Sequence, residues 1–269
     1  MRILSCNVRR DNVAVDGENQ WARRKGLCCE VIRSADADLI CTQELSRAQF
    51  LDLRAALTEY DWFGMVDTVV DRDPMNAVFY RRKAFDLVSA GGYWLSETPH
   101  LPGSKSWDSD CIRLANWARL VDVGSGVEFR VVNTHLDHVS QLARENQVRL
   151  INEDAAAYSP EYPQVLTGDL NAGADNPAIA ACRRAGWTDT WEAVHGPQGP
   201  GTTFHRFLGP AFAAQGAKID WIFIRGNAAA QAAHIRRDSH DGRFPSDHYF
   251  LSADVILPEG PSDRPETLP

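Results

Sequence analysis

Apolar and polar residues follow two different periods along this chain of 269 residues. Short apolar runs predict strands at 2–7 and 38–44, and apolar residues three or four apart predict an amphipathic helix over 21–34. Ser46 and Gln49 have capping-box spacing and predict a second helix that runs toward Leu57. The chain is therefore expected to begin as β-α-β-α.

Beyond residue 60 the pattern changes to short strands with turns between them. A long helix is predicted over 139–156, and Asn176-Pro177 predicts the start of a short one. The predicted strands are 61–70, 76–80, 85–89, Trp94, 117–123 paired with 127–134, 164–167, 219–224, 234–237 and 249–255. Helices separated by runs of hairpins favour a two-sheet sandwich flanked by helices over a doubly wound parallel sheet.

Residues 1–256 are expected to form one domain, because two-sheet folds of this length often do. Residues 257–269 are rich in proline and charge, which predicts a disordered tail. The chain shows no signal peptide and no apolar run of membrane-spanning length. A monomer in the cytoplasm, without a membrane partner, is the expectation.

The charge balance restricts the choice of partner. Lys and Arg number 28 and Asp and Glu number 36, a formal net charge of −8. Proteins that grip long nucleic acid usually carry a basic face, so long duplex substrates are disfavoured. The basic runs 23–25 and 81–83 are interpreted as solvated faces. Six cysteines without a Cys-x-x-Cys pair argue against a zinc knuckle.

Polar residues capable of chemistry occur where predicted strands end. Because strand ends gather at one edge of a sheet, these side chains are expected to lie near one another. They are Asn7, Glu44, His135, Asp169, Asn171, Asp220, Asp247 and His248.

Each of these residues also has a structural alternative. Residues 168–171 alone are compatible with an ordinary β-turn, Asn7 with a strand-end hydrogen bond, and His135 with a structural histidine. Asp220 is different, because it is flanked by apolar residues and a buried carboxylate needs a partner. His248 is the natural candidate. The combination, more than any single residue, indicates a hard divalent cation and a general base acting on a phosphate ester.

The chain resembles the endonuclease/exonuclease/phosphatase superfamily, whose members have a DNase I-like fold. The matching segments occur in family order and are 6–7, 42–44, 133–136, 167–171, 218–223 and 246–248. The resemblance implies a four-layer α-β-β-α sandwich of the α/β (α+β) class, with two mixed sheets packed face to face and helices outside. Leu170 departs from the family pattern, in which Phe is common, at a position that is expected to pack.

The resemblance also implies roles. Mg²⁺ or Mn²⁺ would be held by Glu44 and Asn7, with a contribution from Asp247. Asp169 and His248 would prepare the attacking water, and Asp220 would orient His248. His135 and Asn171 would hydrogen-bond the non-bridging oxygens of the phosphate.

Four further residues are predicted to contact the substrate. Arg113 and Arg119 match phosphate geometry, although a surface ion pair is the alternative for each. Asp137 and His138 would rim the site, and Phe204 would line the pocket. The expected function is hydrolysis of a small or short phosphate ester by a phosphodiesterase or phosphatase. A nuclease and a non-catalytic binding protein that keeps the fold are the alternatives.

Overall fold

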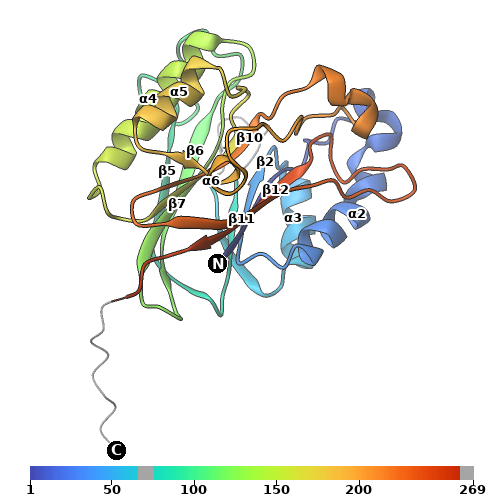
Figure 1. Ribbon diagram of the computed structural model, residues 1–269. Coiled ribbons are helices and arrows are strands. Elements are labelled where there is room, and N and C mark those ends of the chain that lie inside the picture. Colours follow the sequence, from blue (N-terminus) through green and yellow to red (C-terminus); the bar gives the residue numbers. More distant parts are fainter. Residues whose placement is uncertain (66–75, 261–269) are drawn as a thin grey trace, which may run out of the picture.

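Two mixed β-sheets of six strands each pack face to face, and helices cover their outer faces (Figure 1). This computed structural model describes residues 1–65 and 76–260. Helices α2 and α3 lie outside one sheet, and α4 and α5 lie outside the other. The predicted four-layer sandwich is therefore confirmed.

The two sheets repeat one pattern of strand directions. Each contains a single parallel pair, β1 with β2 or β7 with β8, flanked on both sides by antiparallel pairs. The first sheet has the order β11 (Ala229–Arg236), β12 (Phe250–Ile256), β1 (Arg2–Asn7), β2 (Leu39–Gln43), β4 (Val78–Arg81), β3 (Tyr60–Phe63). The second has the order β5 (Phe85–Trp94), β6 (Leu114–Asp122), β7 (Glu128–His135), β8 (Gln164–Asp169), β10 (Asp220–Arg225), β9 (Thr188–Asp189).

Long helices form the crossovers of the two parallel pairs, as parallel strands require. Ser46 and Gln49 make the predicted capping box at the start of α3, and Asn176 caps α5. The helical segments are α1 (Val13–Asp16), η1 (Gly17–Asn19), α2 (Trp21–Ser34), α3 (Arg47–Ala56), α4 (Gln141–Ala156), α5 (Pro177–Arg184), α6 (Thr190–His195) and η2 (Gly209–Gln215).

Alternation along the central strands divides their side chains between two hydrophobic layers. Ile3, Val131 and Val165 face the space between the sheets, whereas Leu4 and Val132 face the helices. Both faces of these strands are buried, so the strands read as continuous apolar runs.

The space between the sheets becomes polar toward one end. Asn133 of β7, fully buried, accepts a hydrogen bond at Oδ1 from Gln43 Nε2 of the opposite sheet, at 2.7 Å. The Asn133 Nδ2 group donates to the carbonyls of Thr42 and Ala77, at 2.8 and 3.2 Å. One amide side chain therefore joins one sheet to the other.

The predicted elements agree with the structure except in a few places. Residues 85–89 and Trp94 belong to one strand, β5, and the strand at 234–237 begins earlier, at Ala229. Of the strand predicted at 61–70, the structure has Tyr60–Phe63, and residues 66–70 lie outside the described residues. Strand β9 and helix α6 were not predicted, because their two- and six-residue lengths leave almost no periodicity.

Met1, just before β1, lies beside the last residues of β12, at the end of the sandwich away from Asn7. Met1 and Val255 exchange two backbone hydrogen bonds of 2.8 Å. Leu257, the first residue of the predicted tail, still packs against the core between the sheets, and residues 261–269 lie outside the described residues. Within the described part of the chain, none of the helices combines the length and apolar character that crossing a membrane needs.

Replacing Asn133 with Asp tests the contact between the sheets. The change keeps the size of the side chain but turns the donor to two carbonyls into a buried acceptor with a charge. We expect the free energy of unfolding to fall by about 3–5 kcal/mol, measured by urea denaturation at pH 7. The same change at exposed Asn227 is the control and should cost less than about 0.5 kcal/mol. Equal effects of the two substitutions would contradict this role of Asn133.

Candidate active site

The strand register of the second sheet places three of the predicted residues next to one another. His135 of β7 pairs with Asp169 of the parallel strand β8, and Asp220 of β10 pairs with Asp169 from the other side. All three side chains are buried. Gly168 allows the strands this close approach, because a Cβ at its φ of +155° would lie 2.2 Å from the Thr134 carbonyl oxygen.

The first sheet contributes Asn7 and Glu44 from its facing edge. Asn7 Nδ2 donates to Glu44 Oε1 and to Asp169 Oδ2, both at 3.0 Å, and so joins the two sheets within the site. Its Oδ1 accepts from the Arg9 N–H at 2.9 Å. The predicted role of Asn7 as a metal ligand stays a prediction, since its nitrogen is the atom that faces the carboxylates. Glu44 has a φ of +64°, a strained conformation that often marks functional positions.

His248 and Asp220 form the pair that the sequence predicts. The His248 Nδ1 lies 2.9 Å from Asp220 Oδ2, and Thr203 Oγ1 accepts from the Asp220 N–H at 3.2 Å. Burial acts to lower the pKa of His248, but the Asp220 and Asp169 carboxylates raise it well above 6.5. The ring is therefore an imidazolium at neutral pH. The pair stabilises the fold fully below pH 6.5, and this contribution is lost as the pH rises through the folded pKa.

Asp169 lies at the centre of the cluster. Asn171 N donates to Oδ1 at 2.9 Å, and the His135 and His248 Nε2 atoms lie 3.4 and 3.7 Å from Oδ2. Burial and the neighbouring Asp220 raise the pKa of Asp169 to about 7, despite the opposing effect of His248. Near neutral pH this carboxylate can therefore take up and release a proton.

Burial also shifts the pKa values of the remaining ionisable groups of the site. Burial raises the pKa of Asp247, whose Oδ2 lies 3.9 Å from Arg9 Nε. Burial would also raise the pKa of Glu44, but hydrogen bonds from the Arg10 N–H and the Asn7 amide lower it. Burial and Arg113 lower the pKa of His135 well below 6.5, so that ring is neutral.

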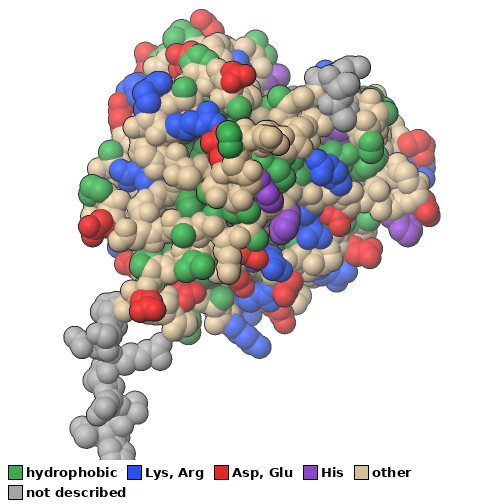
Figure 2. All heavy atoms as spheres, viewed as in Figure 1, with side chains coloured by type: hydrophobic (Ala, Val, Ile, Leu, Met, Phe, Trp, Pro, Cys, Tyr) green, Lys and Arg blue, Asp and Glu red, His purple; other side chains and the backbone are tan. Residues whose placement is uncertain are grey.

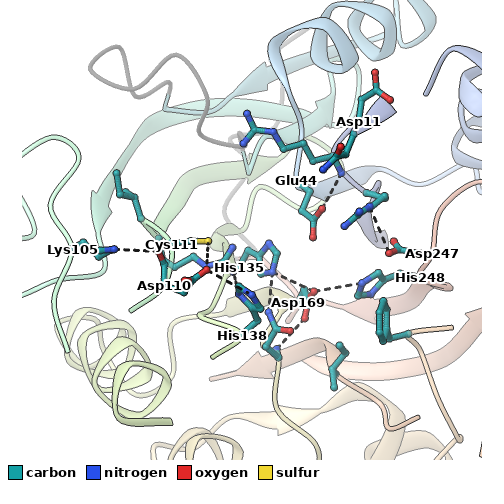
Figure 3. A pocket seen from close by; sticks show the side chains of 18 of the residues that line it. Asp11, Glu44, Lys105, Asp110, Cys111, His135, His138, Asp169, Asp247 and His248 are labelled. Atoms are coloured by element: carbon teal, nitrogen blue, oxygen red, sulfur yellow. Dashed lines mark hydrogen bonds and ion pairs between the residues drawn. The ribbon is translucent and has the colours of Figure 1, made fainter. Parts of the chain in front are cut away.

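These side chains face a cavity of about 730 Å³ (Figure 3). Glu44, Asp169, Asp247 and His248 lie on one side of it, and Lys105, Asp110, Cys111 and His138 lie on the other, with His135 between them. The cavity is thus a carboxylate-rich half joined to a half that carries cationic and imidazole groups. The volume suits one small molecule.

Three of the four predicted substrate contacts line this cavity: Arg113, His138 and Phe204. Arg113 is 6% exposed, its Nη2 lies 3.5 Å from His138 Nδ1, and its Nε has no hydrogen-bond partner among the residues that the structure describes. The Phe204 ring lies 4.9 Å from the His248 ring. A buried guanidinium with free donors is suited to an anion.

The prediction for Arg119 is wrong. Its Nη2 lies 2.6 Å from Glu128 Oε1, and it does not line the cavity. Its neighbours Ala118 and Leu120 face the core between the sheets, so alternation turns Arg119 to the outer face of β6. The surface ion pair is the correct interpretation.

Sequence patterns did not identify several functional residues that lie after β1 and before β6. Arg9, Arg10 and Lys105 line the cavity, yet in sequence they are ordinary surface-type cations. Arg24, interpreted as part of a solvated face, is 3% exposed. Its guanidinium donates to the carbonyls of Val8 and Pro245 at 2.6 and 2.9 Å and joins the loops that carry Arg9 and Asp247.

The donor set fits a hard divalent cation. Glu44, His135 and Asp169 each direct one ligand atom toward a common space, with these atoms within 4.8 Å of one another. Five carboxylates line the cavity, those of Asp11, Glu44, Asp110, Asp169 and Asp247. Oxygen donors of this kind suit Mg²⁺ or Mn²⁺ better than zinc.

A two-sheet sandwich with this constellation at one end has the architecture of a DNase I-like phosphoester hydrolase. Residues 4–248 match the model of the Endonuclease/Exonuclease/phosphatase family, and the chain belongs to that family. Its members are phosphoesterases that generally depend on a divalent metal.

Similar solved structures cover nearly the whole chain. An endonuclease/exonuclease/phosphatase from Bacteroides vulgatus is 32% identical, with a TM-score of 0.88 over 96% of this chain and 98% of that one. A mannosyl-6-phosphatase from Bacteroides thetaiotaomicron is 28% identical, with a TM-score of 0.87 over 96% of this chain and 100% of that one. Nocturnin of Drosophila melanogaster is 30% identical over 172 residues, which are 60% of this chain and 25% of that protein.

The charge on His248 can be tested by histidine ¹⁵N NMR. We expect an imidazolium at pH 7 in the unmodified protein. In Asp220→Asn the pKa should fall below 6.5, because burial remains while the main stabilising charge is lost. Exposed His240 serves as the internal control and should not respond. A neutral His248 ring at pH 7 in the unmodified protein would show that the pair is assigned wrongly.

Proposed function

We propose that this protein hydrolyses the phosphate monoester of a small polar molecule, such as a sugar phosphate, with Mg²⁺ or Mn²⁺. The observation that carries this proposal is the cavity of about 730 Å³, in which Arg113, whose Nε has no hydrogen-bond partner among the described residues, lines the same space as Glu44 and Asp169. A monoester dianion would supply a negatively charged partner for this buried guanidinium. The likeness to a mannosyl-6-phosphatase over the whole chain supports the same substrate class.

The surface supports a small substrate over long nucleic acid. On the face shown in Figure 2, acidic and basic side chains are interspersed, and basic ones form no continuous patch. The net charge of −8 has the same implication, because binding to polyanions depends on many phosphate contacts. Four basic residues, Arg9, Arg10, Lys105 and Arg113, instead line the cavity.

The residues of the site divide the chemistry among them. Glu44 and Asp247 would hold the metal, with Asn7 orienting Glu44 and Asp169. The bound ion supplies Lewis-acid stabilisation of negative charge on the phosphoryl group. Asp169, with a pKa near 7, accepts the proton of the attacking water at its carboxylate.

The phosphate is bound from several directions. His248, fixed as an imidazolium by Asp220, donates a hydrogen bond to a phosphoryl oxygen. Asn171 and His135 lie side by side at the cavity, with Asn171 Nδ2 2.9 Å from His135 Nε2, and Arg113 lines it beside His138. Groups already arranged for an anion stabilise the charge of the transition state without having to reorganise.

A substrate panel with Mg²⁺ or Mn²⁺ tests the proposal. It contains sugar 6-phosphates, p-nitrophenyl phosphate, bis-p-nitrophenyl phosphate, mononucleotides, short single strands and plasmid DNA. We expect the highest kcat/KM on a sugar phosphate and loss of turnover with EDTA. Preference for short strands would favour a nuclease, and preference for the bis-ester a phosphodiesterase. Activity that persists in EDTA would overturn the metal requirement.

Asp169→Asn is the matched inactive variant for this panel. It keeps the size of the side chain and its place in the cluster but removes the base. We expect kcat to fall by about 10²–10⁴-fold with the fold intact by circular dichroism. Near-normal turnover in this variant would refute the role of Asp169 and would trace the activity to another residue.

A further inference from the structure

The strongest unused feature near the cavity is the carboxylate of Asp137, which follows β7 and has no exposed surface. Its Oδ1 accepts from the N–H groups of Val139 and Ser140, at 3.0 and 2.7 Å. Its Oδ2 accepts from the N–H groups of Asp110 and Cys111, at 2.8 and 3.2 Å. The Ser109 hydroxyl adds a further contact to Oδ2 at 2.9 Å.

These two sets of donors belong to different walls of the cavity. Residues 109–111 lie in the loop between β5 and β6, which contributes Lys105 and Arg113 to the lining. Val139 and Ser140 follow His138 directly and lead into α4. One carboxylate therefore connects the segment that positions Arg113 to the segment that positions His138.

Capping of α4 does not account for this arrangement. The N-cap of the helix is Ser140, whose hydroxyl accepts from the Ala143 N–H at 3.1 Å. The bonds of Asp137 to Val139 and Ser140 are local, but those of Oδ2 cross 26 and 27 positions of sequence to the other loop. The local bonds to Val139 and Ser140 are those of an ordinary turn. The bonds to Asp110 and Cys111 hold the two walls of the cavity together.

The groups around Asp137 require an ionised acid at this place. Every neighbour of its oxygens is a donor, and hydrogen bonds from N–H groups favour a carboxylate over an amide. Burial alone would raise the pKa of Asp137, but these bonds lower it to about 2. An Asn would turn an NH₂ group against at least one N–H donor.

We propose that Asp137 is a positioning residue for substrate binding, which sets the distance between Arg113 and His138. The inference rests on the proposed function, since it takes the anion of the substrate to contact both Arg113 and His138, which lie 3.5 Å apart. Asp137 does not line the cavity, so it acts only through the loops that it joins. Its loss should weaken anion binding while the carboxylate half of the site, which stands on other strands, keeps its geometry.

The decisive comparison is Asp137→Asn against Asp122→Asn. Asp122 also accepts from a backbone N–H and a serine hydroxyl, both of Ser125, but it lies at the opposite end of β6. For Asp137→Asn we expect KM to rise about tenfold to a hundredfold and kcat to change little, because hydrogen bonds to a charged group are lost outside the reacting centre. For Asp122→Asn both constants should stay unchanged.

Titration calorimetry with inorganic phosphate provides a readout that does not depend on turnover. The affinity for phosphate should fall in Asp137→Asn by the same factor as KM rises. If the unmodified protein binds phosphate but hydrolyses no ester, the proposed function fails and this comparison still decides the role of Asp137. Unchanged phosphate affinity and KM in folded Asp137→Asn would overturn the inference, as would a fall in kcat alone.

Ser109→Ala covers the case in which Asp137→Asn does not fold. It removes one uncharged donor from Oδ2 and leaves the backbone bonds in place. We expect KM to rise about threefold to tenfold, with kcat unchanged. No change in KM or phosphate affinity would count against the proposal.

Discussion

The contact between the two sheets through Asn133 is the constraint on which the site depends. Half of the candidate residues stand on one sheet and half on the other, so their separation is the separation of the sheets. A purely apolar interface would allow the sheets to slide, because hydrophobic burial has no direction. The amide of Asn133 has direction, since it accepts from Gln43 and donates to two backbone carbonyls. Asn7 makes the equivalent bridge nearer the opening.

The same interface explains why the site lies at one end. Along β8, alternate residues Val165, Thr167 and Asp169 all face the space between the sheets. The series runs from apolar, through hydroxyl, to carboxylate, and β7 has a parallel series that ends at His135. Polarity therefore rises toward the opening, and the ionisable groups meet only at its edge. There each carboxylate affects the pKa of the next, and the cluster as a whole favours binding of positive charge.

Much of this arrangement follows from sequence by physical rules. Strand ends gather, so the polar residues after β1, β2, β7 and β8 were expected to meet. A buried Asp220 needed a partner, and His248 is that partner. Arg119 was misassigned although the alternation of Ala118 and Leu120 already turned it outward. Asp137, predicted to rim the site, and Arg24, predicted to lie on a solvated face, instead join loops, and these roles lay beyond prediction for another reason. Both make hydrogen bonds to backbone groups that are distant in sequence. Every residue except proline has the same backbone groups, so the sequence does not indicate which of them will be the partner.

The backbone pairing of Met1 with Val255 has a practical consequence. Met1 and Val255 lie where β1 begins and β12 ends, whereas Asn7 and His248 lie at the opposite end of these two strands, at the site. Material attached at Met1 would extend away from the opening of the cavity. Immobilisation on a support through this end would leave the opening facing solution. A short linker between the two adjacent strands would also permit new chain ends to be cut elsewhere, because the join would bridge neighbours that are already hydrogen-bonded.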